Sequence, residues 1–145
     1  IDPIRTLVDA DVLTICAGGG GIPVVAAPGG ALEGIEAVID KDHAAGLLAR
    51  QLEADAFLML TDVDAVYTGW GTPEAAAIAA APPSALRAMD LPAGSMGPKV
   101  AAACDFVEAG GAFAAIGRLN DAVALVDGTA GTRVSASATD LQRRD

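Results

Sequence analysis

The sequence predicts an α/β fold, and three observations support this prediction. Apolar segments patterned like strands alternate with segments whose apolar residues recur at helical spacing. Glycine-rich loops follow strand-like segments, most clearly at residues 18–21. The continuous apolar run 56–60 is typical of a central parallel strand buried on both faces. With 145 residues and no visible repeat or linker, one domain is the simplest partition.

The first half of the chain is predicted to alternate helix and strand. A helix ends near residue 10, and the β-branched run 12–16 is predicted to be a buried strand. Pro28, Gly29 and Gly30 predict a turn. A second helix is predicted to begin near Asp40 or Asp42, because acidic residues are favoured at helix starts.

The second half continues the alternation after an irregular excursion over residues 68–93. Short helices are predicted within that excursion, and regular elements are predicted to follow it. The predicted elements are helices at 74–80, 84–89, 98–109 and 120–126, strands at 112–116 and 131–134, and a loose polar tail at 135–145.

Composition excludes several classes of function. The formal net charge of −10 argues against nucleic acid or an anionic membrane surface as the partner. No apolar run is long enough for a membrane span, and no signal peptide is visible. Cys16 and Cys104 are interpreted as small buried hydrophobes, which fits a reducing cytoplasm. One histidine and two distant cysteines do not indicate a metal cluster.

Residues 94–99, Gly-Ser-Met-Gly-Pro-Lys, form the strongest candidate site. This glycine-broken loop runs into a helix, with Pro98 suited to the first helical turn. Backbone N–H groups, the helix dipole and Lys99 together favour a bound phosphate. The spacing of a Walker A loop is absent. An ordinary junction with a solvated lysine remains the alternative, although Lys99 and Lys41 are the only lysines in the chain.

Two further stretches are candidates. Lys41 lies at a predicted helix start, where a cation opposes the helix dipole, and this hints at function; His43 is predicted to be a surface residue without chemistry. The stretch 61–67 places polar residues after a buried strand, where open α/β sheets bind ligands. Within it, Tyr67 either packs on a base or caps the core. The four glycines at 18–21 permit close approach to a ligand or form a plain turn.

Five stretches taken together resemble carbamate kinase, a member of the amino-acid kinase family. The resemblance runs from Ile1 to about Val134 and covers only the carboxyl-terminal half of that family's chain. His43 and the polar tail depart from the family pattern. The stretches are residues 16–24, 37–42, 60–67, 94–99 and 128–133.

The resemblance implies a three-layer α/β/α sandwich with a mostly parallel central sheet, in which residues 1–134 form an amino-acid kinase-like nucleotide-binding lobe. It implies phosphoryl transfer from ATP to carbamate, or the reverse reaction from carbamoyl phosphate and ADP, in cytoplasmic arginine metabolism. Lys41 and Lys99 would contact the transferring phosphoryl group from two sides, and Asp42 would hold the two ammonium groups in place.

The resemblance also implies the remaining site residues and partners. Mg²⁺ would accompany the nucleotide, the intact enzyme would be a homodimer, and the isolated half would be inactive. Two alternatives remain open: another amino-acid kinase, or a noncatalytic nucleotide-binding fragment. The implied nucleotide-binding residues are Thr61, Asp62, Asp64, Tyr67, Met96 and Gly97, and the implied carbamoyl-side loop is Gly18, Gly19, Gly20 and Gly21.

Overall fold

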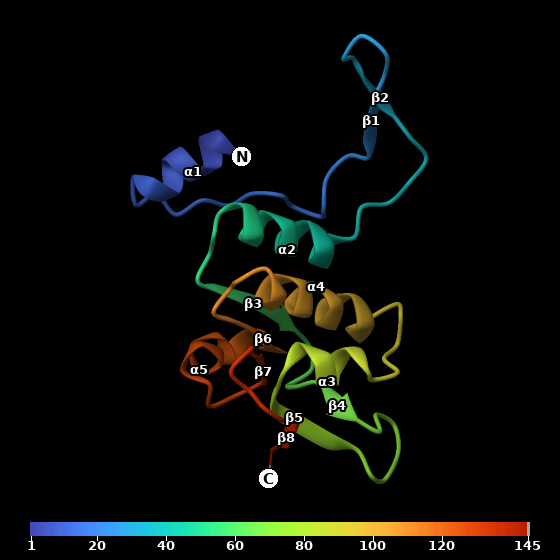
Figure 1. Ribbon diagram of the computed structural model, residues 1–145, viewed down its shortest axis with the longest axis vertical. Coiled ribbons are helices and arrows are strands. Elements are labelled where there is room, and N and C mark those ends of the chain that lie inside the picture. Colours follow the sequence, from blue (N-terminus) through green and yellow to red (C-terminus); the bar gives the residue numbers. More distant parts are fainter. Residues whose placement is uncertain (145) are drawn as a thin grey trace.

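The computed structural model describes residues 1–144 and confirms the α/β class (Figure 1). One mixed sheet carries helices on its faces, and a small hairpin stands apart from it. The strands are β1 Val24–Ala26, β2 Leu32–Gly34, β3 Ala56–Thr61, β4 Tyr67–Thr68, β5 Ala76–Ala81, β6 Phe113–Arg118, β7 Thr132–Val134 and β8 Gln142–Arg143. The helices are α1 Asp2–Asp9, α2 Lys41–Gln51, α3 Pro83–Arg87, α4 Met96–Glu108 and α5 Ala122–Asp127.

The main sheet has the strand order β3-β6-β7-β5-β4, and β8 pairs with β5. Its longest ladder is parallel and joins β3 to β6 from Ala56↔Phe113 to Thr61↔Arg118. β5 and β7 are also parallel, whereas β7 runs antiparallel to β6. The prediction of a parallel strand at 56–60 is confirmed. Its predicted central position is wrong, because β3 is an edge strand in the described part of the chain. The run 56–60 is as apolar as a strand at the centre of a sheet, but β6 is the only strand that pairs with it in the described part of the chain.

Helix α4 packs on the sheet and lies beside α2, which contacts β3 as well (Figure 1). The predicted apolar stripe on α4 is confirmed, because all four of its members are buried: Val100, Ala103, Cys104 and Val107. Phe106, also on α4, is buried as well, with its ring centroid 5.7 Å from that of Phe57. Helix α5 contacts β3 and β6 through the fully buried Leu125, which lies against Gly117.

Residues 1–39 contain no buried residue. Figure 1 shows α1 and the β1–β2 hairpin standing away from the sheet, with α2 between them and α4. The helix near residues 2–10 and the turn at 28–30 are confirmed. The buried strand at 12–16 is not formed: Leu13 and Ile15 are 93% and 96% exposed, and Cys16 is an exposed free thiol. A strand needs a hydrogen-bonded neighbour, and no described strand lies beside this segment.

Two other predictions are corrected. The alanine-rich segment 74–80 was predicted as a helix, but it forms β5, because pairing with β4, β7 and β8 overrides the helix propensity of alanine. The tail after Val134 was predicted to be loose, yet its described part docks on the sheet. The Arg144 amide donates to the Ala77 carbonyl at 2.8 Å, and its guanidinium reaches the carbonyls of Thr129 and Gly131.

The remaining predicted elements are confirmed within one or two residues at most boundaries. They correspond to α2, α3, α4, β6, α5 and β7. Within residues 1–144, none of the helices combines the length and the apolar character that crossing a membrane requires.

Candidate functional site

A cavity of about 430 Å³ opens where β3 ends and where α2 and α4 begin. The meeting of a strand's carboxyl end with two helix starts is a common ligand position in α/β sheets. The lining residues are Asp40, Lys41, Asp42, Thr61, Asp62, Val63, Ala65, Tyr67, Trp70, Leu91, Pro92, Gly94, Ser95, Met96, Pro98 and Lys99.

The start of α2 is fixed by Asp40, its N-cap. The Asp40 carboxylate accepts hydrogen bonds from the backbone N–H groups of Asp42 at 3.0 Å and His43 at 2.9 Å. The His43 ring also lies 2.9 Å from the same oxygen. These bonds, led by the one from the His43 backbone, lower the pKa of Asp40. Because Asp40 caps the helix, the side chain of Asp42 is free to face the cavity.

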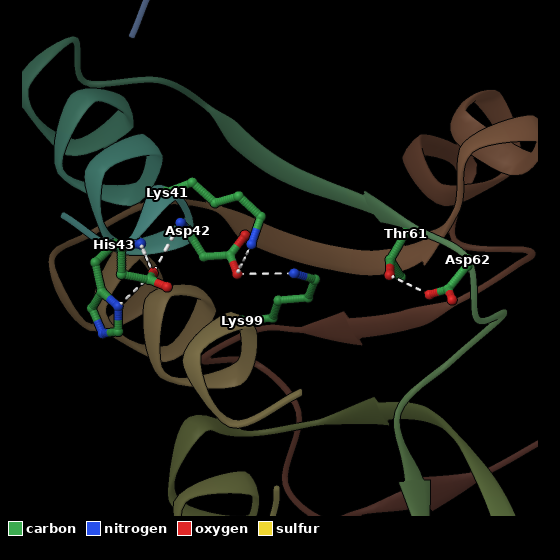
Figure 2. A network of polar contacts seen from close by, with 7 residues as sticks. Lys41, Asp42, His43, Thr61, Asp62 and Lys99 are labelled. Carbon is green, nitrogen blue, oxygen red and sulfur yellow. Dashed lines mark hydrogen bonds and ion pairs between the residues drawn. The ribbon is translucent and has the colours of Figure 1, made fainter. Parts of the chain in front are cut away.

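Asp42 holds both lysines of the chain (Figure 2). Its Oδ2 lies 2.9 Å from the Lys99 Nζ and 3.5 Å from the Lys41 Nζ. Asp42 and Lys99 are nearly buried, whereas the Lys41 side chain is 63% exposed. The two lysines therefore differ: Lys99 is fixed by packing and a close ion pair, and Lys41 reaches in from solvent.

This arrangement favours an anion. Lys41 is the first residue of α2, and Lys99 lies in the first turn of α4, so both ammonium groups are at the positive ends of helix dipoles. One carboxylate oxygen serves both ammonium groups. Helix α4 also begins without a side-chain cap, since Ser95 makes no such bond. A phosphate group would supply the additional negative charge.

The opposite end of the cavity has a different chemistry. Thr61 is the last residue of β3 and Asp62 follows it, and the Thr61 hydroxyl donates to the Asp62 carboxylate at 3.0 Å. Figure 2 shows this pair separated from the lysine cluster, on the far side of the space between them. Tyr67 and Trp70 add two aromatic rings there, with centroids 5.0 Å apart in an edge-on arrangement. One cavity is thus lined by two lysines, two aromatic rings and the Asp62 carboxylate.

Tyr67 is anchored from behind by Asp64. Its hydroxyl donates to the Asp64 carboxylate, with oxygen distances of 3.1 and 3.2 Å. Burial raises the pKa of Tyr67, and the hydrogen bond to Asp64 raises it further. Arg118, at the end of β6, lies 3.8 Å from the same carboxylate. Asp64 therefore sits outside the cavity lining and supports a ring that belongs to it.

The structure brings most of the predicted site residues into one cavity, and leaves six outside it. The residues brought together are Lys41, Asp42, Thr61, Asp62, Tyr67, Met96 and Lys99. Besides Asp64, Gly97 is outside, because it faces a separate cavity of about 340 Å³ between α3 and α4. The loop Gly18–Gly21 is also outside the lining. Its Gly20 lies against the Ile39 carbonyl, where a Cβ atom would approach to 2.7 Å.

The lining residues that the sequence analysis did not assign to the site include Asp40, Trp70, Leu91 and Pro92. Asp40 was recognised only as a possible cap, and Trp70 was passed over within an excursion considered irregular. A signal for Trp70 existed, because it is the single tryptophan of the chain and lies between two glycines.

The described site residues offer few protein ligands to a magnesium ion. Among residues 1–144, no group of three or more His, Cys, Asp or Glu side chains is placed to hold a metal ion. Asp42 forms ion pairs with both lysines. Asp62 also lines the cavity, and none of the ion pairs described within residues 1–144 includes it. These residues fit a Mg²⁺ held mainly by the phosphates of a nucleotide.

Comparison with known proteins identifies the family of this chain. Residues 1–117 match the model of the amino acid kinase family. The chain is 52% identical over 141 residues to a carbamate kinase of Rhizobium meliloti, covering 96% of this chain and 44% of that protein. It is 47% identical to a carbamate kinase of Haemophilus influenzae, covering 93% of this chain and again 44% of the relative.

A solved structure agrees with these sequence matches. The carbamate kinase of Giardia lamblia bound to AMP-PNP superposes with a TM-score of 0.87 at 39% identity, covering 92% of this chain and 48% of that one. The chain therefore spans less than half the length of each of these relatives.

Proposed function

The chain belongs to the amino acid kinase family, and from this premise we propose that it supplies the ATP- and ADP-binding half of a carbamate kinase. The observation that carries the proposal is the pair of lysines at two helix starts, held by one buried carboxylate. The relative solved with bound AMP-PNP supports a nucleotide as the ligand. The complete enzyme would transfer a phosphoryl group between ATP and carbamate in either direction.

In this proposal the phosphates lie at the lysine end of the cavity. Phosphoryl transfer depends on positioning and on neutralising charge that moves between oxygens. Lys99, already fixed by Asp42, would bind a phosphate oxygen with little loss of freedom. Lys41, which is more exposed, would approach the transferring group from the other side. Asp42 keeps two like charges close together, and thus acts as a positioning residue.

The base and sugar lie at the other end. The Asp62 carboxylate is a hydrogen-bond acceptor suited to ribose hydroxyls, and Thr61, Tyr67 and Met96 line the same cavity. When Mg²⁺ is bound, it offsets the negative charge of the nucleotide phosphates. The loop Gly18–Gly21 would serve the carbamoyl side only in an assembly that brings it nearer to the lysines, because it lies outside the present cavity.

Titration calorimetry of ADP with Mg²⁺ tests this proposal directly. We expect saturable binding that weakens by at least about tenfold in Lys99→Ala, because a charge-assisted hydrogen bond is lost. Lys41→Ala should weaken binding less, since that ammonium is more exposed. Arg50→Ala is the matched control, because it removes the same charge from the other end of α2. Absence of binding by the folded chain, or equal effects of all three variants, contradicts the proposal.

A turnover assay tests the claim that this is a half enzyme. The purified 145-residue chain should form no ATP from carbamoyl phosphate and ADP. Robust ATP formation would show that the acceptor site is complete within it. A substrate panel on the intact enzyme then separates a carbamate kinase from another amino acid kinase.

A further inference from the structure

We propose that His43 sets the charge at the lysine end of the cavity through Asp40, so that its protonation tightens nucleotide binding as pH falls. The inference rests on the proposed function and adds regulation by pH to the same site. His43 is the single histidine of the chain, and its side chain is 50% exposed. Histidine is the side chain that ordinarily changes charge between about pH 5 and 8. A proton from solvent can therefore change the charge beside the cavity near neutral pH.

His43 is bonded directly to a residue of the cavity. Its Nδ1 lies 2.9 Å from Oδ1 of Asp40, and Asp40 lines the cavity. Figure 2 shows the His43 ring beside the lysine cluster, on the side away from Thr61 and Asp62. An ionised carboxylate only accepts hydrogen bonds, so Nδ1 carries the hydrogen of this bond and Nε2 takes up the second proton. The bond therefore persists in both charge states, and protonation adds a charge without removing the cap of α2.

The charge of the cavity lining explains why one proton matters. Its carboxylates outnumber its ammonium groups, although the proposed ligand is itself a polyanion. A protonated His43 offsets the Asp40 charge from 2.9 Å, whereas a neutral His43 does not. Anion binding therefore favours the protonated form, and by linkage the protonated form binds the anion more tightly. The ionisable lining residues in this balance are Asp40, Asp42, Asp62, Lys41 and Lys99.

The other charged groups near α2 are engaged elsewhere or lie at its opposite end. Helix α2 packs against α4 and contacts β3, and β3 has no ionisable side chain. The remaining groups are Lys41 and Lys99, both paired with Asp42; Asp105 and Glu108 on α4, both paired with Arg87; Arg50 in the last turn of α2; and Arg5, which reaches the Gln51 carbonyl. Within residues 1–144, the described ion pairs give His43 one partner, Asp40. His43 thus acts through that carboxylate and is a positioning residue.

Proton NMR tests the linkage on the unmodified chain. Because the chain has one histidine, its ring signals report the titration of His43 alone. Saturation with Mg²⁺-ADP should raise the pH at which these signals are half-titrated by about half a pH unit, which corresponds to about a threefold gain in affinity on protonation. An unchanged titration at full ADP occupancy, measured in parallel by calorimetry, overturns the inference and leaves the proposed function intact.

A matched variant separates charge from hydrogen bonding. In His43→Asn the amide nitrogen takes the place of Nδ1 and still donates to Asp40, but it does not titrate. The ratio of ADP affinities at about pH 6 and pH 8 should be about threefold larger in the wild type than in this variant. Ionisation of the ADP phosphates contributes equally to both proteins and cancels.

The remaining outcomes each decide the matter. Equal ratios in the wild type and His43→Asn overturn the inference. A loss of affinity in His43→Asn that is the same at both pH values also overturns it, because His43 would then have a structural role only. Failure of Mg²⁺-ADP to bind the folded wild type at either pH refutes the proposed function and the inference together.

Discussion

Residues 1–39 and residues 40–144 are both rich in apolar side chains, but they are packed in opposite ways. The first segment has no buried residue and exposes Leu13, Ile15 and Val38 almost completely. The second holds every member of the core, including the fully buried Phe106 and Ile78. The difference teaches that apolar composition does not by itself make a core. A side chain contributes to stability only where a complementary surface lies against it.

The largest expected effect comes from the core of the second region. Phe106→Ala removes a ring that packs on Phe57 and on the backbone of Gly111. We expect the free energy of unfolding to fall by about 3–5 kcal/mol, because a cavity replaces the ring. Urea denaturation followed by circular dichroism measures this. Leu13→Ala, at a site 93% exposed, is the control; a similar loss there would erase the contrast between the regions.

A buried hydroxyl gives the next effect. Thr132 is fully buried; its Oγ1 donates to the Ile78 carbonyl at 2.6 Å and accepts from the Val66 amide at 2.9 Å. Thr132→Val keeps the shape but leaves two buried backbone groups without partners, which should cost about 2–3 kcal/mol. Thr129→Val is the control, because that hydroxyl is exposed. An unchanged free energy of unfolding in Thr132→Val would mean that packing alone determines the contribution of this side chain.

The boundary between the two regions is fixed by a helix cap. Asp40→Ala removes the acceptor for two backbone N–H groups of α2 and should lower stability by about 1 kcal/mol at neutral pH. The folded-state pKa of Asp40 is depressed, so its contribution is complete above the unfolded-state pKa and is lost as pH falls through the folded-state pKa. The stability difference between variant and wild type should therefore begin to shrink as pH falls below the unfolded-state pKa, and it should vanish below the lowered folded-state pKa. A stability difference that persists when Asp40 is protonated would show that the ionised carboxylate is not its cause.

The smallest effect is expected in the first region. The double variant Leu13→Ser, Ile15→Ser should change the free energy of unfolding by less than about 0.5 kcal/mol, because neither side chain is packed. It should also reduce self-association and the binding of a hydrophobic dye, as measured by light scattering and fluorescence. A large loss of stability would show that this segment packs in solution, and would remove the basis of the comparison.

Much of the candidate site was accessible from the sequence because its signals are local. Residues 94–99 combine a glycine loop, a helix start and a lysine, and both lysines of the chain do lie on one carboxylate. The aromatic end was less accessible. Tyr67 was named, but Trp70 was not, because its nearness to Tyr67 depends on a turn whose glycine conformations no periodic pattern records.

The sequence by itself determined the α/β class, the positions of α2 and α4, and the apolar stripe on α4, because capping and helical periodicity act over a few neighbouring residues. For two apolar runs, only the tertiary structure decided whether a strand formed. Residues 76–81 pair with strands from distant parts of the chain, whereas residues 12–16 meet no described neighbour and stay exposed. Strand formation needs hydrogen bonds and packing from another segment, and a local pattern does not specify whether that segment will be present.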